Sequence, residues 1–350
     1  MDLKELIKIG VEKKASDIHI TVGIPPVYRV NGELIKYGDK ILDPEGTKFL
    51  VTQILNERQL KELNEKGELD TSFSSPGFGR FRVNAFKQRG SYGMALRIIP
   101  LRIPTMEELR LPQVVKELSR LPRGLILVTG PTGSGKSTTL ASMIDLINNE
   151  KSYHILTLED PIEYLHKHKM SIVNQREIGS DSLNFANALR AALRQDPDVI
   201  LVGEMRDLET ISIALTAAET GHLVLSTLHT LGAAKTIDRI IDVFPPYQQQ
   251  QIRIQFSSVI QAIISQQLLT MSDGKGRVAA FEIMVATQAI RNLIREEKNH
   301  QIDTAIQTGG KYSMKTMDSS ILELYKDGII SRDTALNQSI NVDMMKKFII

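Results

Sequence analysis

The 350-residue chain contains no cysteine. Disulfide bonds and zinc sites built from thiolates are therefore excluded, and a reducing cytoplasm is the expected compartment. No apolar run approaches the roughly 18 residues that a membrane-spanning helix requires, and nothing at the N-terminus resembles a signal peptide. If the protein works at a membrane, we expect it to be recruited there peripherally, to the inner face.

Neither sign of charge is in excess. Forty-three Lys and Arg residues stand against 41 Asp and Glu, which leaves a formal charge of +2. A chain with so little net charge does not have the overall positive charge typical of proteins that bind nucleic acids or anionic membrane surfaces, so no nucleic-acid partner is expected. The hydrophobic content of 42% is ample for real cores, and the length favours two domains.

The most informative segment runs from Gly130 to Ser137 and reads Gly-Pro-Thr-Gly-Ser-Gly-Lys-Ser. It matches the P-loop pattern and follows an apolar run typical of a buried strand. Glycines let the backbone curl so that its N–H groups face phosphate oxygens, and the following helix adds its positive end. Lys136 is expected to reach the β- and γ-phosphates of ATP, and Ser137 to bind Mg²⁺. The expected nucleotide-binding residues here are Gly130, Thr132, Gly133, Ser134, Gly135, Lys136, Ser137 and Thr138.

The first hundred residues read as an α+β domain. The dipeptide Asn31-Gly32 predicts a hairpin between two short strands. Further along, Phe81, Val83 and Ala85 alternate with basic residues, which predicts a strand with one apolar and one basic face. Four prolines between residues 99 and 123 break up regular structure. We therefore expect an N-terminal domain over residues 1–98, a linker over 99–115 that acts as a hinge, and a second domain over 116–350.

The second domain alternates strands and helices from residue 124 onward. This rhythm predicts a parallel β-sheet covered by helices on both faces, an α/β fold. After Gln248 the chain is predicted to be mostly helical, because Ile252, Phe256, Ile260 and Ile263 follow a helical spacing.

Two acidic segments follow predicted strands. The segment from Asp198 to Glu204 reads as a buried strand that ends in a carboxylate, but glycine stands at 203, where P-loop enzymes usually have an aspartate. Glu204 is therefore interpreted as the residue that polarises the attacking water. A second acidic run from Glu159 to Glu163 follows the preceding strand, and Glu163 is its favoured catalytic member, acting with Glu204 or on Mg²⁺-bound waters. A capping or solvating role stays open for each acid in this run.

Histidines flank the predicted strand 223–228. Their spacing is not that of a metal site. His229 at the strand end suits a sensor of the γ-phosphate, and His222 suits a structural hydrogen bond; a purely structural role stays open for His229 as well. Arg82 and Arg97 lie on polar strand faces of the first domain, where they are either simply solvated or supply the charge that a P-loop site needs in its transition state. Arg80 shares this strand face, and Arg194, Arg206 and Arg239 are weaker candidates for that charge.

The chain resembles the secretion ATPase superfamily of type II secretion and type IV pilus motors. The resemblance rests on three segments that follow the P-loop: the acidic run Glu159 to Glu163, the segment Gly203 to Asp207, and the stretch that contains His222 and His229. The resemblance covers nearly the whole chain. The stretch from Ala289 to Glu296 resembles a motif associated with the retraction branch, and the absence of cysteine-based zinc binding favours that branch. From the residues alone, this stretch predicts a half-buried surface helix. Ser226 and Phe281 depart from the family pattern, which has glycine and histidine there more often.

The resemblance implies a PAS-like N-terminal domain joined to a RecA-like ATPase domain with C-terminal helices, in a homohexameric ring. It implies a motor that hydrolyses ATP with Mg²⁺ to retract a type IV pilus, through a platform protein of the inner membrane. It also implies that Arg82 and Arg97 approach the nucleotide. The alternatives are a pilus assembly or secretion ATPase, a DNA translocase, which would need a basic pore, and a nucleotide sensor that scarcely hydrolyses.

Overall fold

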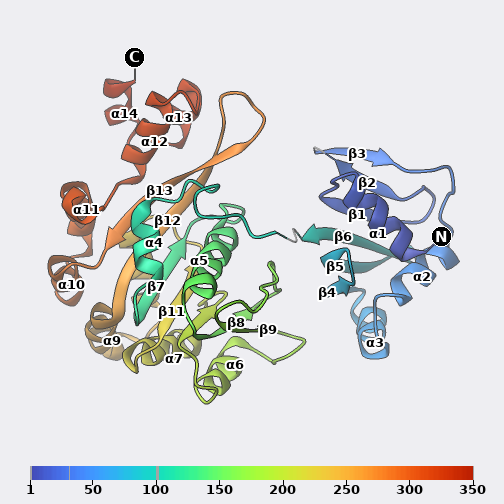
Figure 1. The fold of residues 1–350 in the computed structure, drawn as a ribbon, viewed down its shortest axis with the longest axis horizontal. Helices are drawn as coiled ribbons and strands as arrows, with labels where there is room; N and C mark the ends of the chain where they lie inside the picture. Colours follow the sequence, from blue (N-terminus) through green and yellow to red (C-terminus); the bar gives the residue numbers. More distant parts are fainter. Residues whose placement is uncertain (1, 31, 100–101, 350) are drawn as a thin grey trace. The chain divides into compact units, whose positions relative to one another are not determined.

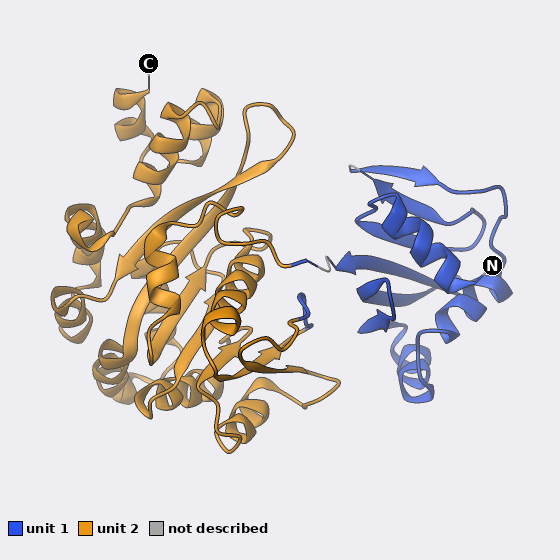
Figure 2. Ribbon diagram, in the orientation of Figure 1, with its two compact units in different colours: residues 1–102, 161–165 blue, residues 103–160, 166–350 orange. Residues whose placement is uncertain are grey.

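The computed structural model describes residues 2–30, 32–99 and 102–349, which divide into two compact units (Figure 2). Unit 1 comprises residues 1–102 together with 161–165, and unit 2 comprises residues 103–160 and 166–350. The change from one unit to the other after residue 102 falls inside the stretch 99–115 that the prolines single out. In the described ranges, no helix is both long and apolar enough to cross a membrane.

Unit 1 is built on a six-stranded antiparallel sheet in the order β3-β2-β1-β6-β5-β4 (Figure 1). Its strands are β1 (Asp17–Ile20), β2 (Val27–Val30), β3 (Glu33–Lys36), β4 (Glu68–Ser75), β5 (Gly79–Gln88) and β6 (Ser91–Ile99). Its helices are α1 (Leu3–Glu12), α2 (Pro44–Thr52) and α3 (Glu57–Lys66). The pairing of β2 with β3 is the predicted hairpin; Asn31 of its turn lies outside the described residues.

The alternation predicted in unit 1 is confirmed in β5. Phe81, Val83 and Ala85 are fully buried and join the core of the unit. Because successive side chains of a strand point to opposite faces, Arg80 and Arg82 lie on the other face of the sheet. Strand β6 continues that face and places Arg97 directly opposite Arg82 in the antiparallel register.

Unit 2 contains a seven-stranded sheet in the order β13-β12-β7-β11-β10-β8-β9. Its strands are β7 (Gly124–Thr129), β8 (His154–Glu159), β9 (Ile172–Glu177), β10 (Val199–Val202), β11 (Leu223–Leu228), β12 (Ile260–Thr270) and β13 (Arg277–Val285). All neighbouring strands run parallel except β13, which pairs antiparallel with β12 at one edge. The predicted parallel sheet is therefore confirmed.

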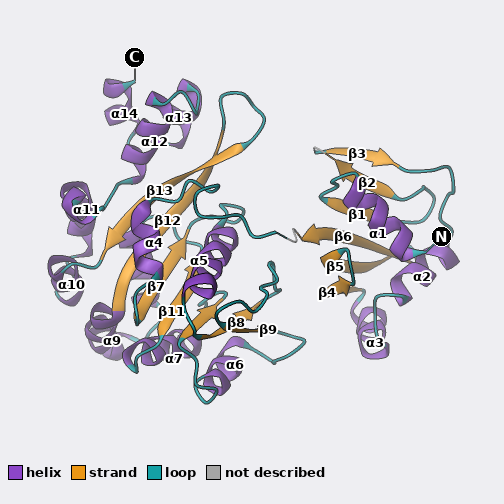
Figure 3. Cartoon of the chain, in the orientation of Figure 1, coloured by secondary structure: helices purple, strands orange, loops and turns teal. Residues whose placement is uncertain are grey.

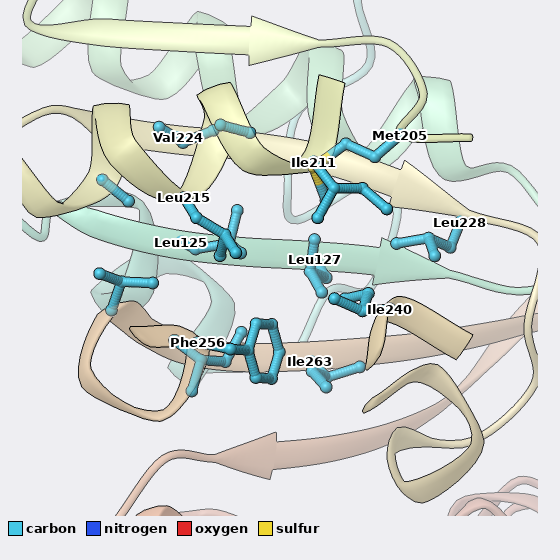
Figure 4. Packing of buried hydrophobic residues seen from close by; sticks show 14 of the residues in the cluster. Leu125, Leu127, Met205, Ile211, Leu215, Val224, Leu228, Ile240, Phe256 and Ile263 are labelled. Carbon is cyan, nitrogen blue, oxygen red and sulfur yellow. The ribbon is translucent and has the colours of Figure 1, made fainter. Parts of the chain in front are cut away.

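Helices cover both faces of this sheet (Figure 3). Unit 2 contains α4 (Gln113–Ser119), α5 (Lys136–Glu150), α6 (Phe185–Ala192), α7 (Leu208–Glu219), α8 (Ala233–Asp242), α9 (Pro246–Val259), α10 (Gln288–Arg295), α11 (Ile302–Thr308), α12 (Met317–Lys326), α13 (Arg332–Gln338) and α14 (Val342–Phe348). On one face, α4 and α5 pack in a core that includes Ile126 of β7. On the other, Leu125 and Leu127 pack in a core with Leu215 of α7 and Phe256 of α9 (Figure 4).

The helical prediction after Gln248 is wrong for residues 260–285, which form β12 and β13, and is confirmed further along by α10 to α14. Helix α9 ends at Val259, and Ile260 and Ile263 belong to the eleven-residue strand β12. This segment is buried on both faces of the sheet, so its apolar residues do not alternate with exposed polar ones. Without that alternation, periodicity alone cannot distinguish a strand from a helix.

The stretch from Ala289 to Glu296 forms most of α10 and is a half-buried helix, as predicted. Ile290 and Ile294 are fully buried in the core on the α7 face of the sheet. On its other side, the Arg291 guanidinium donates to the carbonyls of Ser257 and Ser258 at 2.5 and 2.9 Å. These carbonyls lie in the last turn of α9, so Arg291 caps that helix and complements its dipole.

Candidate active site

The P-loop connects the buried strand β7 to helix α5, at the carboxyl edge of the parallel sheet. Gly130, Gly133 and Gly135 have φ values of 139°, 79° and 89°. These angles lie in the left-handed region, where a side chain would be strained and glycine is not. The backbone conformation thus explains why the three glycines occupy these positions, and it leads directly into the N-terminus of α5, where anions bind favourably.

Lys136 is the first residue of α5, and only 8% of it is exposed. Its ammonium donates to the carbonyl oxygens of Gly130 at 2.8 Å and Pro131 at 3.0 Å. The same nitrogen lies 3.4 Å from Nδ1 of His229. The lysine charge is therefore held over the loop and points to the end of strand β11.

His229 and Glu204 meet beside this lysine. His229 follows β11 and Glu204 follows β10, and the carboxyl ends of these adjacent parallel strands lie at one edge. Nε2 of His229 is 3.4 Å from Oε2 of Glu204, while Nδ1 is 3.5 Å from Oγ1 of Thr132. The structure thus brings Lys136, His229 and Glu204, predicted as site residues from separate segments, into one continuous chain of polar groups.

Glu204 is held ionised by its neighbours. Burial of its carboxylate, whose side chain is 18% exposed, raises its pKa. A hydrogen bond from Arg206, at 2.5 Å, and the charges of His229 and Arg206 lower the pKa more, so it lies below its usual range. Arg206, a weaker candidate from the sequence, therefore acts on the site through Glu204.

The backbone beside Glu204 explains why glycine stands at position 203. A Cβ at Gly203 would lie 3.1 Å from the carbonyl oxygen of Leu158 and 3.4 Å from Cα of Glu159. An aspartate there would require strand β8 to move by a few tenths of an ångström. Oγ1 of Thr227 donates to the Gly203 carbonyl at 2.6 Å, which fixes the turn that carries Glu204.

The second acidic segment acts on this chain of groups through Asp160: the pKa of Arg206 is raised by its hydrogen bond to Glu204, by the charge of Glu204 and also by the charge of Asp160. Oε1 of Glu159 accepts hydrogen bonds from Thr157 at 2.7 Å and Gln175 at 3.1 Å, within the sheet. Glu163 is exposed and lies in the short segment 161–165 that groups with unit 1. The contacts that join Lys136, His229 and Glu204 do not include it, so its catalytic role stays a prediction.

The two histidines lie at opposite edges of the sheet. His222 precedes β11, and its Nδ1 lies 2.9 Å from the carbonyl oxygen of Ala217 and 3.2 Å from Oγ1 of Thr220. His222 thus caps the C-terminal end of α7, which is a structural role. The strand that separates His222 from His229 explains why the pair is not a metal site.

Two residues that depart from the family pattern are accommodated in the core. Ser226 is fully buried, and its hydroxyl donates to the carbonyl oxygen of Val202 at 2.7 Å. Phe281 is 3% exposed and packs among the apolar residues of the α5 face. Neither departure changes a group in the chain from Lys136 to Glu204.

Ser137 lies in the first turn of α5 and is half-buried. Within the described ranges, no three His, Cys, Asp or Glu side chains gather in a cluster able to hold a metal ion. The hydroxyl at the phosphate loop is a hard oxygen ligand of the kind that Mg²⁺ accepts, in company with phosphate oxygens.

Arg82 and Arg97 of unit 1 are exposed and stand opposite each other on β5 and β6. Nε of Arg97 donates to Oδ1 of Asp17 at 3.0 Å, and Nε of Arg29 lies 3.9 Å from the other oxygen of that carboxylate. Arg80 is engaged with Ser72 and Ser74 of β4. Unit 1 therefore carries a strongly basic strip on its sheet.

Comparison with known proteins gives consistent matches over almost the whole chain. A family model described as type II/IV secretion system protein matches residues 2–337. The chain is 53% identical over 335 residues to the type IV pilus retraction ATPase PilT of Pseudomonas aeruginosa, covering 96% of this chain and 97% of that protein. It is 50% identical over 320 residues to a twitching motility protein of Neisseria gonorrhoeae, covering 91% and 86%.

A solved structure of the pilus retraction motor PilT with bound ADP is similar along 99% of both chains, with a TM-score of 0.93 and 51% identity. This likeness confirms the RecA-like ATPase fold expected from the sequence. Because the family model and these relatives each span most of the chain, the protein belongs to the type II/IV secretion system protein family.

Proposed function

We propose that the chain is the subunit of an ATP-hydrolysing motor that powers retraction of type IV pili. The observation that carries this proposal is the continuous chain of Lys136, His229, Glu204 and Arg206. It lies next to a P-loop whose three glycines have positive φ values. The high identity to a pilus retraction ATPase and a twitching motility protein supports the cellular role.

In this proposal the loop binds the triphosphate of ATP. Backbone N–H groups of the loop, with side chains of Thr132 and Thr138, surround the phosphates, and Lys136 clamps the β- and γ-phosphates. Ser137 and phosphate oxygens would hold Mg²⁺, which supplies charge neutralisation for the leaving group. The two carbonyls that Lys136 contacts now are replaced by stronger phosphate partners, so the clamp forms with a small side-chain movement.

Glu204 is proposed to orient the attacking water. A carboxylate with a lowered pKa is ionised at neutral pH and accepts a hydrogen bond from water opposite the leaving group. His229, in contact with both Lys136 and Glu204, is placed to report the γ-phosphate to the rest of unit 2. Glu163 is proposed to assist on the water or on Mg²⁺-bound waters once its loop is placed by the assembly.

The exposed arginines of unit 1 fit a site shared between subunits. In a homohexameric ring, Arg82 and Arg97 of one subunit would approach the phosphates bound by its neighbour and neutralise the charge of the transition state. ATP binding would then close an interface and hydrolysis would open it, with movement about the stretch 99–115. Such a ring would couple to an inner-membrane platform protein of the pilus machinery, recruited to the cytoplasmic face.

The cellular proposal is tested by deleting the gene in its host and counting pili. We expect many surface pili with no twitching, because retraction is lost while assembly continues. A deletion strain without pili would instead assign the protein to pilus assembly. The biochemical part is tested by phosphate release from the purified protein with ATP and Mg²⁺; no release above background would contradict an ATPase motor.

A further inference from the structure

A glutamine on the strand next to the P-loop is tied to the loop from inside the protein. Gln266 belongs to β12, which pairs with β7, and is 3% exposed. Its Oε1 accepts a hydrogen bond from Oγ1 of Thr139 at 2.8 Å, and its Nε2 donates to the carbonyl oxygen of Ser134 at 2.6 Å. One buried side chain thus bridges the loop and the first turn of α5.

The backbone of the loop is also packed against this residue. A Cβ at Gly130 would lie 2.2 Å from the backbone oxygen of Gln266, and a Cβ at Gly135 would lie 2.8 Å from its Nε2. Real Cβ atoms do not approach a backbone oxygen so closely, so Gly130 is required by the position of β12 as well as by its φ angle, and a side chain at Gly135 would displace the Gln266 amide. The loop therefore rests directly on β12.

We propose that Gln266 is a positioning residue for phosphate binding, a role that rests on the nucleotide site proposed above. By donating to the Ser134 carbonyl, the amide holds that oxygen toward β12, so that the N–H of Gly135, in the same planar peptide group, points the opposite way. A carbonyl turned toward the phosphates would repel them, whereas converging N–H groups attract them. The second bond, from Thr139, holds the start of α5 in the same register.

The hydroxyl of Ser134 does not share this task. Its Oγ is buried, and in the described part of the chain it has no hydrogen-bond partner. Lys136, for its part, contacts the carbonyls of Gly130 and Pro131 at the beginning of the loop. The bond from Gln266 is therefore the contact that orients the middle of the loop from the sheet side.

The first test compares Gln266→Leu with Gln267→Leu. Leucine at 266 has a similar volume and removes both hydrogen bonds, whereas Gln267 lies on the opposite face of β12 and serves as the matched control. Binding of a fluorescent ADP with Mg²⁺ is titrated, and thermal unfolding is measured without nucleotide. We expect the Kd to rise about tenfold in Gln266→Leu and to change little in Gln267→Leu, because a buried carbonyl left unpaired no longer holds its orientation.

The outcomes separate this inference from the function on which it rests. If wild-type protein does not bind the fluorescent ADP, the proposed nucleotide site itself is contradicted. If wild-type protein binds it and Gln266→Leu binds it equally well, the positioning role is overturned while the nucleotide site stands.

A second variant, Gln266→Glu, applies if the leucine variant does not fold. A protonated carboxyl can donate to Ser134 and accept from Thr139 as the amide does, but an ionised one cannot donate and adds negative charge near the phosphates. Burial favours the protonated form. ADP affinity is measured at about pH 6 and about pH 8.5 for Gln266→Glu and for wild type. We expect the affinity of the variant to fall between these two values by a factor several-fold larger than that of wild type, with the folded state retained at both. Parallel pH profiles would overturn the proposal.

Discussion

The phosphate loop of unit 2 and the basic strip of unit 1 hold their charges in opposite ways. In unit 2, Lys136 and Glu204 are largely buried, and each is fixed by hydrogen bonds to named partners. In unit 1, Arg82 and Arg97 are exposed and stand directly opposite each other in the antiparallel register. Asp17 compensates Arg97, but its carboxylate is also approached by Arg29.

The charged groups of unit 2 are thus held in fixed positions before any ligand binds, whereas unit 1 carries exposed positive charge on its sheet. The loop glycines already have the positive φ values of a curled loop, and Lys136 is already held over it by hydrogen bonds. Like charges directly opposite each other in a sheet are destabilising, and an anion placed between them would relieve that repulsion. If the proposed function holds, phosphate would give the arginines of the basic strip an anionic partner, and it would replace the carbonyls that Lys136 contacts in the loop. The predictions that follow test each side of this contrast.

Lys136→Ala is expected to have the largest effect. It removes the charge over the loop, so phosphate release should fall to the background level, at least a hundredfold below wild type. Folding should be retained, because the ammonium contacts named above, to the carbonyls of Gly130 and Pro131 and to His229, lie within the loop and at the end of β11 and not in the apolar core. Lys116→Ala, which removes a surface partner of Glu107, is the matched control and should hydrolyse normally. Turnover by Lys136→Ala near the wild-type rate would contradict the proposed phosphate site.

Glu204→Gln should bind ATP but hydrolyse it at least tenfold more slowly, since an amide accepts a proton far less readily than a carboxylate. Nucleotide titration and phosphate release measure the two parts separately. Glu209→Gln provides the control, because Glu209 forms an exposed ion pair with Arg190 on the same unit. Wild-type turnover in Glu204→Gln would remove this residue from the catalytic role.

Arg82→Gln tests the other side of the comparison. We expect turnover of the assembled protein to fall about fivefold to tenfold, because charge is lost from the transition state and not from the fold. Arg29→Gln, at another arginine of the unit 1 sheet, one that pairs with Asp17, is the control.

Mixing the subunits shows whether Arg82 acts on a neighbour. An equimolar mixture of Arg82→Gln and Lys136→Ala subunits contains interfaces in which the intact lysine of one subunit meets the intact arginine of the next. Phosphate release above the sum of the two separate variants is therefore expected. Activity no greater than that sum would indicate that Arg82 does not act across the interface.

Site residues were easiest to predict from the sequence in two cases: where they form one uninterrupted segment, and where each directly follows a strand of the parallel sheet. The P-loop is one uninterrupted segment, and Glu204 and His229 each follow a strand whose place in a parallel sheet could be foreseen. Gln266 could not be predicted, because it contacts the loop from a strand more than a hundred residues further along. Its strand was also mistaken for helix, since a strand buried on both faces lacks the alternation of apolar and exposed polar residues.

The position of Glu163 shows a second limit of sequence reasoning. Its place after β8 suggested the carboxyl edge of the sheet, but Glu163 is exposed in a segment, 161–165, that groups with unit 1, so its catalytic role stays a prediction. A loop's direction is set by contacts that the local pattern does not encode. Arg206 illustrates the converse, because only the folded turn after β10 shows that this arginine bonds to Glu204.

The smallest predicted effect concerns stability and arises from the burial that characterises unit 2. His166 belongs to unit 2, and its Nδ1 is buried without a hydrogen-bond partner in the described ranges. Burial lowers its pKa from 6.5 to about 4. Between pH 6.5 and about 4, this histidine binds a proton in the unfolded chain but not in the folded chain. Its contribution to the free energy of unfolding is therefore constant above pH 6.5 and falls as the pH drops toward 4.

Urea unfolding at pH 8 and pH 5 measures this effect as a difference between wild type and His166→Gln. Wild type should lose about 2 kcal/mol more than the variant on acidification, because glutamine does not titrate. His300→Gln, at an exposed histidine of the same unit, should follow wild type. If the wild-type and His166→Gln stabilities fall in parallel, the interior of unit 2 does not penalise charge at this position. The contrast with the solvated charges of unit 1 would then be confined to the phosphate site.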